Sequence, residues 1–258
     1  MAEISKLEQI VDSLRGEHGC PWDKKQTPQT LKKYLLEEVY ELIEAIEEKE
    51  PQEVKEELGD VLFILVFLAH IYKEQGYFDL ENTIDLVSKK MIRRHPHVFG
   101  DIKTNDMAEI RARWQEIKSR EKPERHSLLD GVSEALPALS LAYKIGEKAA
   151  QVGFDWQSVK GVLEKVAEET HEFKKALATN NIEKIKEELG DVLFSWVNVA
   201  RLLKISPEDA LRQTIKKFKT RFKLMENEFK RQGKSIQNAS LKEMDALWEQ
   251  IKKQDDIF

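Results

Sequence analysis

The chain has 258 residues, of which 41% are hydrophobic and 34% are charged, and its formal net charge is −5. A chain of this length and apolar content can bury a sizeable core, which excludes a disordered tail or a disulfide-stapled miniprotein. The acidic balance argues against broad electrostatic capture of nucleic acid or of an anionic membrane, so neither is an expected partner.

The sequence favours helices almost throughout, because it contains only 11 Gly and 7 Pro residues and few clusters of β-branched residues. The first residues lack the basic and apolar stretches of a signal peptide. The single Cys20 excludes a disulfide within the chain and suits a reducing compartment. We therefore expect an all-α protein of the cytoplasm.

Apolar residues at helical spacing predict a series of helices in chain order. In the first half they fall near residues 3–15, 28–48, 52–74, 80–94 and 107–120. In the second half they fall near residues 136–150, 158–178, 182–203, 207–231 and 240–253. Candidate N-cap residues are Asn105 or Asp106, Ser206 and Ser240. Pro137 is expected in the first turn of its helix.

The longest apolar run extends from Val61 to Ala69. Its nine residues cannot span a bilayer, which requires about 20. Because the run is apolar on every side, it predicts a helix that is buried on all faces.

The chain is an internal duplication. "KEELGDVLF" occurs at residues 55–63 and again at 186–194, and "LLEEVYEL" in the first half matches "VAEETHEF" in the second at the same offset of 131 residues. "KKMIRR" and "RWQEIKS" also have later counterparts in "KKFKTR" and "LWEQIKK". We therefore predict two tandem homologous helical-bundle domains, at 1–120 and 136–258, joined by a polar linker at 121–135.

Two pairs of acids in the second half are spaced for one helical face each. Glu169 and Glu172 are three residues apart, as are Glu188 and Asp191. The intervening residues suffice to end one helix, turn at "ATNN" and begin an antiparallel partner, so the two pairs can face each other. Carboxylates that converge must take up protons or hold cations, and hard oxygen ligands suit Mg²⁺ or Mn²⁺.

The same pattern occurs in the first half, at Glu38, Glu41, Glu57 and Asp60. An acidic pair on a charged helix is often only a solvated face, but here the acids run directly into an apolar stretch and recur. The Glu-x-x-His step from Glu168 to His171 is typical of di-iron carboxylate bundles, yet no second step follows on the facing helix. A non-catalytic helical adaptor is the other alternative, because charge-rich helices are common to all bundles.

The motif "EExxE" followed by "ExxD" on a helical hairpin resembles the all-α nucleoside triphosphate pyrophosphohydrolases. Its duplication, together with "CPWD" at residues 20–23 and "RRHPHVFGD" at 93–101, resembles the two-domain MazG proteins. The resemblance implies Mg²⁺-dependent hydrolysis of nucleoside triphosphates to monophosphates and pyrophosphate. It also implies a homodimer, with a role either in removing aberrant nucleotides or in adjusting a stress response.

The resemblance also assigns residues of the second half. It implies that Glu169, Glu172, Glu188 and Asp191 are metal ligands, and that Glu168 and Glu187 orient the attacking water or accept its proton. Candidates for contacts to the substrate are Lys184, Asn198, Lys217, Arg221, Trp248 and Lys252. Lys217 and Arg221 would otherwise form a solvated basic face, and Trp248 would otherwise pack in a core.

The helix after the acids distinguishes the two halves. Two turns beyond Glu188 and Asp191 the second half has Ser195 and Asn198, whereas the first half has bulky apolar residues at the equivalent positions, Ile64 and Phe67. We therefore expect the C-terminal half to be the principal catalyst. The N-terminal half is expected to bind metal but to be obstructed for nucleotides, or to serve mainly in assembly.

Overall fold

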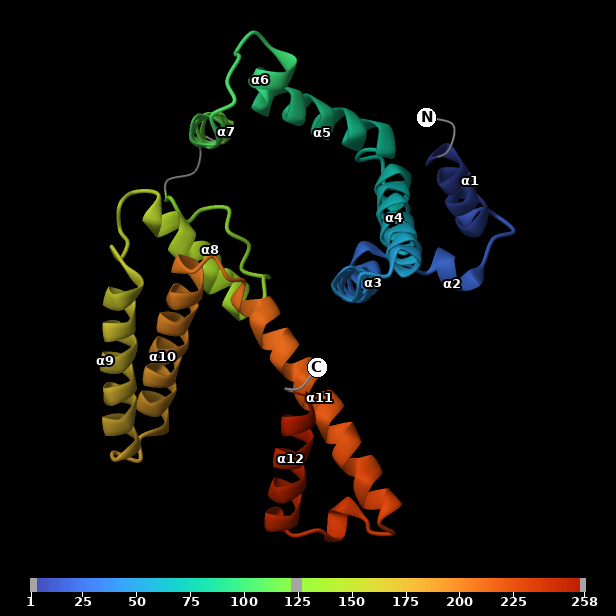
Figure 1. Ribbon diagram of the computed structural model, residues 1–258. Helices are drawn as coiled ribbons and strands as arrows, with labels where there is room; N and C mark the ends of the chain where they lie inside the picture. The colour runs from blue at the N-terminus through green and yellow to red at the C-terminus, as the bar shows by residue number, and fades with distance from the viewer. Residues whose placement is uncertain (1–3, 122–126, 256–258) are drawn as a thin grey trace. The chain divides into compact units, whose positions relative to one another are not determined.

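The computed structural model describes residues 4–121 and 127–255 and divides the chain into two units, Met1–Pro123 and Glu124–Phe258. Every regular element in the described residues is a helix, which confirms the all-α prediction (Figure 1). The boundary between the units falls within the predicted linker at 121–135, of which residues 122–126 lie outside the described residues.

The long helices lie within two residues of their predicted ends. Those of the first unit are α1 (Ile4–Arg15), α3 (Pro28–Glu48), α4 (Pro51–Glu74), α5 (Leu80–Arg94) and α7 (Met107–Arg120). Those of the second unit are α8 (Ala138–Ala150), α9 (Val159–Leu177), α10 (Ile182–Leu202), α11 (Pro207–Arg231) and α12 (Leu241–Asp255). The prediction missed the single turns α2 (Pro21–Lys24), α6 (Pro96–Phe99) and η1 (Ile236–Asn238), because one turn is too short to show a period.

The predicted N-cap residues begin α7, α11 and α12. Asp106 accepts a hydrogen bond from the Ala108 amide, and Ser206 accepts one from the Asp209 amide. The expectation for Pro137 was wrong by one position: it is the N-cap residue of α8, and its extended ψ of 142° places it before the first helical residue.

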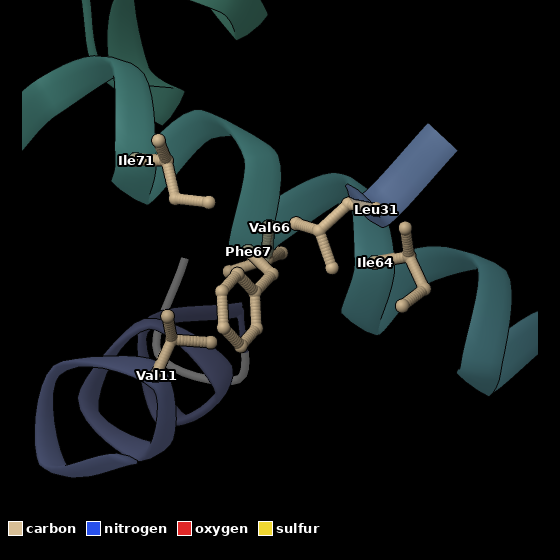
Figure 2. Packing of buried hydrophobic residues seen from close by; sticks show 6 residues of the cluster. All are labelled: Val11, Leu31, Ile64, Val66, Phe67 and Ile71. Atoms are coloured by element: carbon tan, nitrogen blue, oxygen red, sulfur yellow. The ribbon is translucent and has the colours of Figure 1, made fainter. Parts of the chain in front are cut away.

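The core of the first unit forms where α1 and α3 pack against α4 (Figure 2). Phe67 projects from α4 beside Val11 of α1, and Leu31 of α3 lies near Ile64 and Val66. Burying one such side chain stabilises a fold by about 1.5–3 kcal/mol. This core fixes α3 against α4, and with them the acids that both helices carry.

The prediction that residues 61–69 are buried on all faces was wrong. Leu62 and Leu65 remain 38% and 46% exposed, because the helices of the first unit cover only one side of α4. The same apolar face is exposed on α10, where Leu193 is 51% and Trp196 is 52% exposed.

Each unit has an arginine whose side chain is no more than 10% exposed, but the two arginines come from helices that are not equivalent. In the first unit, Arg15 of α1 places its guanidinium 5.5 Å from the centre of the Phe67 ring and pairs with Glu74 at 2.6 Å. In the second unit, Gly146 stands 131 residues after Arg15, and Arg201 of α10 fills the space. A Cβ on Gly146 would lie 2.7 Å from Arg201 Nε.

Candidate functional site

The hairpin of α9 and α10 places the second set of acids. Helix α9 ends at Leu177, and Asn180 then adopts the left-handed conformation, with φ of 52°. The Asn181 side chain accepts hydrogen bonds from the amides of Glu183 and Lys184 and so starts α10. The two helices pack side by side, which brings their acidic faces together (Figure 1).

The carboxylates of the second unit converge in two overlapping groups. Glu169, Glu188 and Asp191 each offer an oxygen atom within 4.8 Å of the others, and so do Glu168, Glu169 and Glu172. Glu169 belongs to both groups and is 7% exposed. All four predicted metal ligands therefore lie in one region that spans both helices.

The surroundings of Glu188 change its affinity for a proton. The pKa of Glu188 is raised by desolvation first and by the charge of Glu172 next, while the charge of Lys184 acts in the opposite direction. Lys184 is therefore close enough to influence the acids, as its placement at the start of α10 suggests.

Lys165 is a further member of this region that the sequence analysis missed. Its ammonium lies 2.9 Å from Glu168 Oε1 and 2.6 Å from Glu169 Oε1, and these two acceptors raise the pKa of Lys165. The available signal was its position one helical turn before both glutamates. The equivalent residue in the first half is Tyr34, so only the second half places a cation here.

The first unit repeats the carboxylate group without that cation. Glu38, Glu57 and Asp60 offer oxygen atoms within 4.8 Å of one another. Desolvation, followed by the nearby carboxylates, raises the pKa of both Glu38 and Glu57. Glu41 lies outside this group, but its charge contributes to both shifts.

These groups fit a divalent cation. The donors are all carboxylate oxygens, which suit Mg²⁺ or Mn²⁺, whereas structural zinc is usually bound by Cys and His. In addition, Glu57 Oε2 is buried and has no hydrogen-bond partner among the described residues. A buried carboxylate oxygen normally has a partner, so this atom has the environment of a ligand.

Glu187 and Asn198 are two further predicted site residues of α10. Glu187 is exposed and belongs to neither carboxylate group of the described second unit. Asn198 is buried: its Nδ2 donates to the Phe194 carbonyl, and its Oδ1 accepts a hydrogen bond from Arg201 Nε at 3.0 Å. Arg201 in turn pairs with Asp155. Asn198 thus belongs to a buried network beside the site.

The remaining predicted contacts lie on α11 and α12, which pack against each other. Lys217 and Arg221 are one turn apart on α11. Trp248 is half-buried on α12, with its ring centre 5.1 Å from that of Phe218, and it packs against the cluster formed by Met225, Phe229 and Ile251. The exposed Lys252 lies 3.8 Å from Glu249.

A cavity of about 170 Å³ lies beside the acids of the first unit. Ile64 and Phe67, which were expected to obstruct this region, form part of its wall. Glu38 and Asp60 line it together with Trp22, Asp23, Leu31, Tyr34 and Phe63.

Among the described residues, no helix combines the length and apolarity that crossing a bilayer requires.

Comparison with protein families gives two matches to one model, that of the MazG nucleotide pyrophosphohydrolase domain, over residues 26–99 and 157–225. The second match begins 131 residues after the first, which is the offset of the internal repeat. Each match includes one of the two helical hairpins and its acids.

Full-length relatives give the same result. The chain is 45% identical over 96% of its length to the nucleoside triphosphate pyrophosphohydrolase/pyrophosphatase MazG of Thermotoga maritima, of which it covers 95%. It is 40% identical to the nucleoside triphosphate pyrophosphohydrolase of Escherichia coli K12, over 99% of both chains. It is also 48% identical to the uncharacterized protein YabN of Bacillus subtilis over 97% of its own length and 52% of that protein's.

Proposed function

Because the chain belongs to the MazG nucleotide pyrophosphohydrolase family, we propose that it hydrolyses nucleoside and deoxynucleoside triphosphates to monophosphates and pyrophosphate with Mg²⁺ or Mn²⁺. The observation that carries this proposal is the convergence of Glu169, Glu188 and Asp191 from the two helices of one hairpin. Removal of unwanted nucleotides in the cytoplasm is the role that we propose for this activity.

The acids of the second unit divide into two roles under this proposal. Glu169, Glu172, Glu188 and Asp191 would hold the divalent cations, which would neutralise the triphosphate and make a water molecule more acidic. Glu168 is more than half exposed beside them, so it can accept a proton from the attacking water. For Glu187 we retain the same auxiliary role from the solvent side of α10.

Cations beside the acids support the C-terminal half as the principal catalyst. Lys165 and Lys184 both influence the carboxylates of the second unit, and ammonium groups stabilise the charge that develops on a pyrophosphate leaving group. The first half has Tyr34 and Glu53 at these positions. It therefore lacks two positive charges that the reaction uses.

For Lys217, Arg221, Trp248 and Lys252, we propose that they contact the substrate from the α11–α12 hairpin. Their support is the family resemblance and the repeated basic pair. We propose that Asn198, which is held by its buried hydrogen bonds, forms part of the wall at one end of the site.

The test is a panel of nucleoside and deoxynucleoside triphosphates, with and without Mg²⁺, in which pyrophosphate and orthophosphate are measured separately. We expect pyrophosphate as the direct product and no turnover after chelation of the metal. Orthophosphate as the direct product would show cleavage of the γ-phosphate and overturn the proposed reaction.

Two double variants test whether the C-terminal half is the principal catalyst. Glu169→Ala/Glu172→Ala is expected to abolish pyrophosphate release, whereas Glu38→Ala/Glu41→Ala is expected to retain most of it. Equal losses from the two variants would refute the asymmetry between the halves.

We also propose a homodimer that covers the exposed apolar faces of α4 and α10. Gly59 and Gly190 occupy equivalent positions within these helices, and a Cβ at either would meet nothing within 4 Å. Glycine inside a helix costs about 1 kcal/mol relative to alanine, and no neighbour in the described residues requires it. A second copy that approaches the helix backbone closely would account for both glycines.

A further inference from the structure

Three residues of the first half are the counterparts of residues proposed to contact the triphosphate in the second. Arg94 of α5 occupies the position of Arg221 on α11 in the internal repeat. Trp114 and Lys118 of α7 occupy the positions of the tryptophan and the lysine on α12. We call Arg94, Trp114 and Lys118 the cationic clamp of the first unit.

The cationic clamp forms where α5 and α7 pack against each other. The Arg94 guanidinium lies 5.1 Å from the centre of the Trp114 ring, and the Lys118 ammonium lies 4.8 Å from the same centre. The ring face attracts both cations, but two cations beside one ring also repel each other. The side chain of Arg94 is only 11% exposed, so water screens this repulsion poorly. The arrangement therefore favours an anion between α5 and α7.

Glu121 supplies that anion from within the chain. Its Oε1 accepts a hydrogen bond from Arg93 Nε at 2.7 Å, and its Oε2 accepts hydrogen bonds from Nε and Nη2 of Arg94. The side chain of Glu121 is 14% exposed. Guanidinium groups bind the oxygens of carboxylates and of phosphates with the same geometry. The Glu121 carboxylate therefore occupies positions on Arg94 that phosphate oxygens would take.

We propose that Glu121 is an autoinhibitory residue, whose carboxylate closes the cationic clamp of the first unit to the phosphates of a substrate. This inference rests on the proposed function, which assigns the equivalent residues of α11 and α12 to the triphosphate. It gives the inequality of the two halves a second cause, besides the two lysines that the first half lacks. The first half is closed to polyphosphate before any chemical step.

An attached carboxylate competes effectively with a free ligand. Because Glu121 belongs to the same chain as the cationic clamp, its local concentration there is about millimolar or higher. A phosphate ligand has to displace it. The apparent affinity for the ligand therefore falls in proportion to the fraction of molecules in which the contact is open.

The second half lacks part of this closure. Thr220 stands at the position of Arg93, so one of the two arginines that bind Glu121 has no counterpart. Asp255 stands at the position of Glu121, and its side chain is one methylene shorter. The combination of two arginines and a glutamate therefore belongs to the first half alone.

The test measures the binding of inorganic pyrophosphate to the full chain in the absence of a metal ion. The parent chain carries Lys217→Ala/Arg221→Ala, which disables the equivalent residues of the second half. Glu121→Gln is then added, because glutamine keeps the size of the side chain but removes the competing charge. We expect calorimetric titration to show at least about a tenfold gain in pyrophosphate affinity, since hydrogen bonds to a charged group are stronger than those to a neutral one.

Three further variants locate the gained site. Arg94→Gln or Lys118→Gln, when added to Glu121→Gln, should each return the affinity towards that of the parent, because each removes a cation of the clamp. Glu116→Gln, an exposed acid of α7 that pairs with Arg120, should leave the affinity of the parent unchanged. Absence of any gain from Glu121→Gln would overturn the proposal. A gain that survives both Arg94→Gln and Lys118→Gln would overturn it as well.

A second measurement separates autoinhibition from a purely structural ion pair. Glu121→Gln removes a contact between two helices and should melt at a lower temperature in either case. Pyrophosphate should nevertheless raise the melting temperature of Glu121→Gln more than that of the parent, because a ligand that binds only the folded state stabilises it. An equal rise in both chains would show a structural ion pair and would contradict the closure.

Release of pyrophosphate from nucleoside triphosphates by the wild-type chain is measured in parallel, so that two failures can be told apart. Absence of release overturns the proposed function, and the titrations with pyrophosphate still decide the closure. Normal release together with no gain from Glu121→Gln overturns the closure and leaves the proposed function standing.

Discussion

At the scale of single residues, Lys165 sets the charge of the second acidic region. Its ammonium contacts Glu168 and Glu169, so it competes with a divalent cation for their oxygens and also lies where phosphates would arrive. These two effects have opposite consequences for a variant without the lysine. They can therefore be separated by experiment.

Lys165→Met is expected to raise the Mn²⁺ affinity of the second half about two- to fivefold, because the competing ammonium is lost from a partly exposed ion pair. Pyrophosphate release should fall at least tenfold, because the phosphates lose a cation. Calorimetric titration in a chain with Glu38→Ala/Glu57→Ala isolates the second half. Lys175→Met, an exposed lysine on the same helix, is the control. Weaker Mn²⁺ binding in Lys165→Met would contradict the competition.

The site itself shows which residues a sequence can predict. The four ligands of the second half follow from helical spacing, because three residues place two carboxylates on one face. The role of Lys165 does not follow in this way. Several glutamates lie within reach of its long side chain, and the sequence does not tell which of them it contacts.

At the scale of elements, Glu121 joins the end of α5 to the end of α7. It accepts hydrogen bonds from Arg93 Nε at 2.7 Å and from Arg94 Nε at 3.0 Å, and Arg94 also lies 5.1 Å from the centre of the Trp114 ring. These donors lower the pKa of Glu121 to about 2. The contact fixes two helices that share little apolar core.

Because the pKa of Glu121 is lower in the folded state, its stabilising effect is present above about pH 4.5 and is lost as the pH falls towards 2. Glu121→Gln should therefore lower the unfolding free energy of the first unit by about 1–3 kcal/mol at pH 7, and its melting temperature should fall as a result. The difference from wild type should shrink between pH 4.5 and 2.5. Thermal melts followed by circular dichroism measure this. Glu116→Gln, in an exposed pair with Arg120, should have little effect at any pH.

The ends of the hairpin helices could be predicted most closely from the sequence. The exposure of their outer faces could be predicted least. Helical spacing and the Asn181 cap indicate where α9 ends and α10 begins. The same apolar residues that predict α4 also suggest that it is fully buried, yet Leu62 and Leu65 are exposed. A hydrophobic pattern identifies a face that must be covered, but it cannot tell whether the chain itself or another copy covers it.

At the scale of the whole molecule, the exposed faces of α4 and α10 predict self-association. Leu62 and Leu193 are equivalent residues at these faces. Light scattering after gel filtration should give a mass twice that of the 30.1 kDa chain for the wild type. Leu62→Glu/Leu193→Glu should give the mass of one chain, because two charges would be buried without partners.

Val152→Glu places the same charge on another exposed apolar residue and should leave the mass doubled. A wild-type chain that elutes as a monomer at all concentrations would contradict the proposed dimer. Retention of the doubled mass by the double variant would instead locate the contact elsewhere on the surface.

Arg15 and Arg201 come from helices that are not equivalent in the two repeats. Helices therefore cannot be exchanged freely between the repeats. A chimera with α1 in place of α8 would force two guanidinium groups into one volume, where Gly146 now leaves room for one. The reciprocal graft would supply no guanidinium and would leave the Glu74 carboxylate without its arginine. Each half has therefore become a matched set of helices, and gene conversion between the repeats would yield chains that fold poorly.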